Sequence, residues 1–268
     1  MAVYDPDSAE MKEYSGIDIF VPGAEMEREI DWDRLFHIFV LTGVAFGLTI
    51  LLTFVMMVPM MAAGLIYIDV VTMTIIIDPA ALLLITFAEI GLIFPPLWYV
   101  RRNGLSLKSI GLSRLGSAKE VVIGLGVGIL ILFANYTITF FIDLIAGRPG
   151  IGDESLFVIS SGLEAAVWIA AMFLIVGFSE ELLFRGFLQR RMELYFSSRQ
   201  SRPQLYALIV TSIVFALMHL EPLGFPTRLV IGLFLGGLAQ KRNYSIMGPT
   251  VAHGLNNAAL VILAYLGI

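Results

Sequence analysis

The 268-residue chain has no cysteine, and charged residues make up only 15% of it. The absence of cysteine excludes disulfides, thiol nucleophiles and cysteine-ligated metals. Hydrophobic residues make up 58% of the chain, whereas a typical soluble domain is about half apolar and about a quarter charged. This composition excludes a disordered chain, a nucleic-acid binder and an ordinary cytosolic globule. The mean hydropathy of +0.86 instead predicts several membrane-spanning helices.

The acidic charge is concentrated at the start of the chain. Residues 1–34 hold 10 Asp/Glu and 3 Lys/Arg, and they contain no basic stretch followed by a short apolar run. We therefore expect an acidic, polar, solvated tail rather than a cleaved signal peptide. The alternative is a surface helix that uses the apolar clusters Ile17–Val21 and Leu35–Phe36.

Seven apolar segments predict an all-α, polytopic transmembrane bundle of about 7–8 helices. Residues 64–77 are also apolar, but they carry Asp69 and are too short to cross, so we expect an extracytoplasmic or interfacial segment. The number of crossings changes if the short sixth segment is re-entrant or if Leu156–Glu164 adds one. The predicted spans are Leu35–Met61, Pro79–Val100, Val121–Ala146, Trp168–Arg190, Leu205–Leu220, Leu229–Ala239 and Ile246–Ile268.

Lysine and arginine gather in three loops, which predicts the orientation of the bundle. The clusters lie in residues 101–119, 190–202 and 241–242. Because cytoplasmic loops carry an excess of Lys and Arg, seven spans with the N-terminus inside place all three clusters in the cytoplasm. We predict a multi-pass protein of the cell membrane.

The fourth predicted span contains charged residues that are costly in a membrane, and such residues indicate a partner, a wet cavity or a function. Glu181 and Arg185 are four residues apart, so they share a helix face and can pair. Glu180 points about 100° away from Glu181. Glu180 is therefore the free carboxylate, suited to proton transfer. The alternative is a structural Glu–Arg pair that locks two helices.

Two further spans carry polar residues at helical spacing. The fifth ends in Phe215-x-x-x-His219, and the last begins with His253-x-x-x-Asn257. A His/Asn pair can stabilise an oxyanion, or it can form an interhelical hydrogen bond; His219 alone could equally be a packed or interfacial histidine. At 1.5 Å of rise per residue, all of these groups reach the middle of the bilayer if their helices are neighbours.

Three other polar residues within the predicted spans belong to no motif. They are Glu89, Asn135 and Asp143. We interpret them as structural or cavity-lining.

A carboxylate, two imidazoles and a carboxamide are together the functional groups of a hydrolase. The chain lacks the His-Glu-x-x-His signature of common zinc proteases and the Gly-x-Ser-x-Gly elbow of serine hydrolases. Glu180, His219 and His253 are nevertheless acceptable Zn²⁺ ligands. A metal-free site and a zinc site therefore both stay open.

The ordered motifs Glu180-Glu181-x-x-x-Arg185, Phe215-x-x-x-His219 and His253-x-x-x-Asn257 resemble those of the CPBP (Abi) family. That family includes CAAX prenyl endopeptidases of the Ras-converting type and lysostaphin-resistance-like proteins. The resemblance covers about residues 160–265. The charge and hydropathy of the chain predict an acidic tail over 1–34 and N-terminal transmembrane helices over 35–150. The resemblance implies a CPBP-like catalytic core over 151–268.

The resemblance implies an intramembrane endopeptidase that acts on a peptide or lipidated protein, with membrane lipid as its surroundings and no nucleic-acid partner. Removal of C-terminal residues from prenylated CAAX-type substrates belongs to this implication. Leu223 stands where the prenyl-processing branch often has a polar residue. This difference argues against strict specificity for CAAX substrates. The implied roles are water activation by Glu180, helix positioning by Glu181 and Arg185, proton transfer or water positioning by His219, and oxyanion stabilisation by His253 and Asn257.

Two non-proteolytic interpretations compete with this one. A membrane immunity or scaffold protein could use the same polar groups to bind a partner. A transporter could use the buried carboxylates as a proton relay, although the chain shows no inverted repeat.

Overall fold

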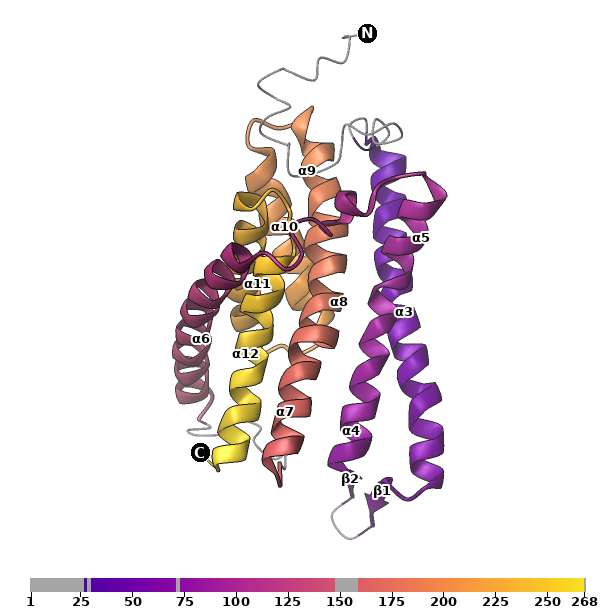
Figure 1. The fold of residues 1–268 in the computed structure, drawn as a ribbon, viewed down its shortest axis with the longest axis vertical. Helices are drawn as coiled ribbons and strands as arrows, with labels where there is room; N and C mark the ends of the chain where they lie inside the picture. The colour runs from indigo at the N-terminus through magenta and orange to yellow at the C-terminus, as the bar shows by residue number, and fades with distance from the viewer. Residues whose placement is uncertain (1–26, 28–29, 71–72, 148–158, 268) are drawn as a thin grey trace.

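A bundle of long apolar helices forms the body of the molecule in the computed structural model, which describes residues 27, 30–70, 73–147 and 159–267 (Figure 1). Within these residues the only strands belong to one small hairpin. The predicted all-α transmembrane class is confirmed, whereas the number of crossings stays a prediction. The four helical segments long and apolar enough to cross a membrane are Trp32–Ala62, Pro79–Arg102, Ala118–Ala146 and Gly162–Ser197.

The first long helix, α3 (Trp32–Ala62), begins three residues before the predicted span. Asp31 caps it, because its carboxylate accepts a hydrogen bond from the backbone N–H of Arg34 at 2.9 Å, a typical N-cap contact. Residues 1–26, which include the proposed surface helix at Ile17–Val21, lie outside the described residues. Because α3 begins at Trp32, residues 32–34 of the expected tail belong to this helix.

The apolar segment expected to be extracytoplasmic or interfacial contains an antiparallel hairpin. Strand β1 (Ile66–Asp69) pairs with β2 (Thr74–Ile77), and Ile66 faces Ile77 in the register. Five of the eight strand residues are isoleucine, a β-branched residue that favours strands. The hairpin joins α3 to the second long helical segment at one end of the bundle (Figure 1).

The second segment is divided into α4 (Pro79–Thr86), the 3₁₀ turn η1 (Phe87–Leu92) and α5 (Phe94–Arg102). Pro95 and Pro96 cause the break, since proline has no N–H to donate to the carbonyl four residues earlier. Gly91 lets η1 approach α3 closely, because a Cβ there would lie 2.7 Å from the backbone nitrogen of Thr49. This turn carries Glu89 and packs against the central helix.

The central helix runs from Gly162 to Ser197, longer at both ends than the predicted span Trp168–Arg190. Leu156, the start of the possible extra crossing, lies outside the described residues. Two π-helical segments flank the short α-helical turn that carries Glu180 and Glu181, and such segments are frequent at functional sites. Its parts are α7 (Gly162–Ala171), η4 (Met172–Gly177), α8 (Phe178–Glu181), η5 (Leu182–Gln189) and α9 (Arg190–Ser197).

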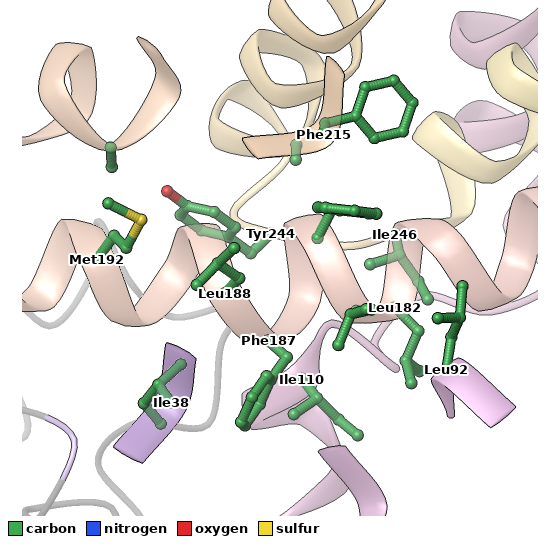
Figure 2. Packing of buried hydrophobic residues seen from close by; sticks show 14 of the residues in the cluster. Ile38, Leu92, Ile110, Leu182, Phe187, Leu188, Met192, Phe215, Tyr244 and Ile246 are labelled. Atoms are coloured by element: carbon green, nitrogen blue, oxygen red, sulfur yellow. The ribbon is translucent and has the colours of Figure 1, made fainter. Parts of the chain in front are cut away.

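Buried hydrophobic residues surround this central helix (Figure 2). Every residue of η5 is buried, as expected for a helix that neighbours enclose on all sides. Ile38 from α3, Leu92 from η1 and Ile246 from the segment before the last helix belong to the same cluster. The helix that carries the paired acidic residues is therefore the centre of the bundle.

Two short helices, α10 (Pro203–Met218) and α11 (Phe225–Lys241), pack against each other beside the central helix. Sixteen residues of α-helix rise only about 24 Å, less than the roughly 30 Å of a bilayer core. The end of α10 accordingly lies beside the middle of the central helix, where the Phe215 and Phe184 rings are 5.0 Å apart. This position brings His219, the residue after α10, to the depth of the acidic turn.

The three segments rich in Lys and Arg meet at one end of the bundle. Arg191 donates to the Ser109 carbonyl at 3.3 Å, and Arg242 pairs with Glu120 at 2.6 Å. Between α11 and α12, Tyr244 donates to Glu193, and burial, with the Glu193 charge, raises the pKa of Tyr244 well above its ordinary value. The predicted orientation requires all three basic segments to lie at the same end of the bundle. Which side of the membrane this end faces stays a prediction.

Helix α6 (Ala118–Ala146) packs closely along α12 (Met247–Leu266). Gly124 and Gly128 form the contact: a Cβ on Gly124 would lie 2.6 Å from the Gly248 carbonyl oxygen, and one on Gly128 would lie 2.9 Å from Leu255. Small residues four apart are a common means of close helix approach in membranes.

We predict that Gly124→Ala lowers the stability of the protein, because the added methyl group meets backbone atoms of α12. Overpacking of this kind costs about 1–3 kcal/mol. Gly126→Ala is the matched control, since nothing lies within 4 Å of its Cβ position, and it should be neutral or stabilise by up to about 1 kcal/mol. Thermal unfolding of both variants in detergent measures the difference; equal melting temperatures would contradict the packing described.

Candidate active site

Glu181 and Arg185 form the buried ion pair that their spacing predicts. The guanidinium NH1 lies 3.1 Å from Glu181 Oε1, and the two side chains are 0% and 1% exposed. Arg185 also lies over the Phe215 ring, 4.4 Å from its centroid, and donates to the Gly232 carbonyl at 3.5 Å. One guanidinium thus connects the central helix to α10 and α11.

His253 joins this pair from α12. Its Nδ1 lies 2.9 Å from Glu181 Oε1, and its Nε2 lies 3.9 Å from Glu180 Oε2. Gly254 makes the approach possible, because a Cβ there would lie 2.4 Å from a ring carbon of Phe173 in η4. When Nδ1 donates to Glu181, the other ring nitrogen faces Glu180.

Glu180 and Glu181 therefore have different surroundings although they are adjacent. Arg185 and His253 lie 3.1 and 2.9 Å from Glu181, whereas Glu180 lies 3.9 Å from His253 Nε2. Glu180 also interacts electrostatically with Arg185. Glu180 is 9% exposed and Glu181 is fully buried. The two adjacent carboxylates thus differ both in burial and in the distance to their nearest cationic or imidazole partner.

His219 lies just beyond α10, with its ring against Phe215 at 4.8 Å and its Nδ1 2.8 Å from the Phe215 carbonyl oxygen. It interacts electrostatically with Glu180 and His253. The Phe215 ring also lies 6.0 Å from the His253 ring. Phe215 is thus the aromatic contact shared by both histidines and by Arg185.

Asn257 follows His253 by one helical turn on α12, so the two share a face. Its carboxamide oxygen accepts a hydrogen bond from Asn256 at 3.2 Å, and Asn256 in turn accepts one from Asn135 of α6 at 3.0 Å. The sequence assigned no role to Asn256, and Asn135 was one of three polar residues without a motif. Their contact joins residues 121 positions apart, which no local spacing indicates.

Residues 162–259 match the family model described as Type II CAAX prenyl endopeptidase Rce1-like. We refer to this segment, which is similar to that family, as the Rce1-like domain. The match confirms the family resemblance drawn from the three motifs, and all the motif residues lie within it. Comparisons with curated proteins and with solved structures gave no match.

Glu89 comes from outside the Rce1-like domain, and sequence reasoning did not place it at the site. It lies on η1, which packs against α8, and it interacts electrostatically with Glu180. The sequence signal that could have indicated Glu89 was an acidic residue within a predicted span, shortly before two prolines. Asp143, the third residue without a motif, lies in the last turn of α6.

Zinc binding by Glu180, His219 and His253 stays a prediction. Across the residues that the structure describes, no three His, Asp or Glu side chains come together as a group that could hold a metal ion. The Nδ1 atoms of His219 and His253 face the Phe215 carbonyl and Glu181, respectively. In each histidine this contact engages Nδ1, and Nε2 is the nitrogen that a metal would bind.

We predict that Arg185→Met destabilises the protein strongly, because it leaves Glu181 buried without its cation. Breaking one side of a buried pair costs about 3–5 kcal/mol. In the double variant Glu181→Gln/Arg185→Met, no charge is left unpaired at these positions, and part of the loss should be recovered. Thermal unfolding of the single and double variants tests this; a double variant less stable than Arg185→Met would contradict it.

Proposed function

We propose that the protein is an intramembrane endopeptidase in which Glu180 activates water to hydrolyse a peptide bond. The observation that carries the proposal is the unequal partnership of the adjacent carboxylates. Glu181 is held by Arg185 and His253, and Glu180 lies beside His253 Nε2. The Rce1-like domain supports a peptidase as the general class.

A water molecule fits between Glu180 and His253 in this proposal. Hydrogen bonds of about 2.8 Å to both atoms are compatible with the 3.9 Å between Glu180 Oε2 and His253 Nε2. If Nδ1 donates to Glu181, Nε2 accepts one water hydrogen while Glu180 accepts the other. The resemblance gave His253 an oxyanion role; this geometry favours water orientation instead.

The reaction then follows general acid–base catalysis. Glu180 removes a proton from the water molecule while the water oxygen bonds to the peptide carbonyl carbon. The carbonyl oxygen becomes an oxyanion, to which the Asn257 amide donates. As the C–N bond breaks, the proton passes to the leaving amine from Glu180 or through His219.

The proposed substrate is a peptide or a lipidated protein in the membrane, including the C-terminal residues of prenylated CAAX-type chains. The family description supports this substrate class. Leu223, in place of a polar residue of the prenyl-processing branch, argues against strict CAAX specificity. The common position of the basic segments supports a multi-pass cell-membrane protein with its N-terminus in the cytoplasm.

We predict that Glu180→Gln lowers kcat by a factor of about 10²–10⁴, the usual contribution of a general base. The change keeps the shape of the side chain and removes its basicity. Cleavage of a farnesylated CAAX-type peptide, followed by mass spectrometry in proteoliposomes, measures the effect. Glu164→Gln is the control, since Glu164 belongs to the same helix and its carboxylate accepts hydrogen bonds from the Ser160 N–H and hydroxyl at the start of that helix.

A folded Glu180→Gln protein that cleaves at the wild-type rate would remove Glu180 as the base. A Glu180→Gln protein that loses no biological phenotype would favour the immunity or scaffold interpretation. Proton-coupled flux in the same liposomes would favour the transporter.

A further inference from the structure

Helix α6 lies outside the Rce1-like domain, and yet it is bound closely to the helix that carries His253 and Asn257. The glycine contacts at Gly124 and Gly128 bring the two backbones together. Two turns further along α6, this close packing brings the polar Asn135 to α12. A residue of α6 that hydrogen-bonds to α12 can therefore influence the orientation of the site residues on α12.

A row of side-chain hydrogen bonds runs from α6 to Asn257. The Thr139 hydroxyl donates to Asn135 Oδ1 at 3.4 Å, and Asn135 Nδ2 donates to Asn256 Oδ1 at 3.0 Å. Asn256 Nδ2 then donates to Asn257 Oδ1 at 3.2 Å. Asn256 is 5% exposed, so water does not readily replace its partners.

The bonds of this row all run in one direction. A carboxamide accepts through its oxygen and donates through its nitrogen, so the orientation of each amide fixes that of the next. Reversing the Asn256 amide would place two donors or two acceptors against each other at a buried side chain, which is costly. Asn257 therefore has its oxygen occupied, and its NH₂ group is the end of the row.

We propose that Asn135 and Asn256 are positioning residues that hold the Asn257 carboxamide with its NH₂ group towards the reacting carbonyl. The proposal rests on the proposed peptidase function, in which Asn257 donates to the oxyanion. Such donors are effective because they are oriented before the reaction begins. Helix α6 thus contributes to catalysis without contacting the substrate.

A double-mutant cycle on turnover tests this coupling. Asn257→Ala should lower kcat about 100-fold, as expected for one lost oxyanion donor. Asn135→Leu should lower kcat about tenfold with little change in KM, because it releases the orientation of that donor. Since Asn135 acts through Asn257, the double variant should be no slower than Asn257→Ala alone.

Ile131→Val is the control, because Ile131 lies one turn from Asn135 on α6, is fully buried and belongs to the apolar core. It should leave kcat unchanged. Independent losses that multiply in the double variant, to about a 1000-fold decrease, would overturn the positioning role while leaving the peptidase intact. A wild-type protein that cleaves no peptide would instead contradict the proposed function.

A measurement without turnover tests the row itself. The chain has only five asparagines (Asn103, Asn135, Asn243, Asn256 and Asn257), so [¹⁵N]asparagine labelling gives few side-chain NH₂ signals in NMR spectra. Asn135→Leu should shift the signals of both Asn256 and Asn257, although Asn257 is not its direct partner. An unchanged Asn257 signal would overturn the proposal whether or not the protein cleaves a peptide.

Discussion

The buried charge of Glu181 is the constraint on which the rest of the site depends. A carboxylate in the middle of an apolar bundle is stable only with partners close at hand, and Arg185 and His253 supply them at 3.1 and 2.9 Å. These contacts fix the central helix against α12, and Arg185 extends them to α10 and α11. Because Glu181 takes these partners, we propose the adjacent Glu180 as the catalytic carboxylate.

Irregular helix geometry brings the other groups to the same depth. The π-helical segments on either side of Glu180 and Glu181 change the rotation of the central helix around them. The prolines after η1 tighten the turn that carries Glu89, and the short α10 ends beside the acidic turn, where His219 follows. Each irregularity has a local cause, but together they form one polar cluster within an apolar bundle.

Local spacing was enough to predict the contacts within one helix. The Glu181–Arg185 pair follows from the i,i+4 rule. The apolar runs predicted the ends of the helical segments to within four residues, except for the central helix, which begins six residues earlier and ends seven residues later than predicted. Contacts between helices could not be predicted, because helix rotation depends on packing that no single segment encodes. Asn135 with Asn256, and Glu89 beside Glu180, are contacts of this kind.

The most direct measurement distinguishes the two adjacent glutamates by chemical labelling. Trimethyloxonium ion alkylates accessible carboxylate groups, and fragment mass spectrometry locates the methyl ester. Glu180 should be modified, with loss of cleavage, whereas Glu181 should be spared because it is fully buried and paired with Arg185. Modification of Glu181 to the same extent as Glu180 would contradict the account.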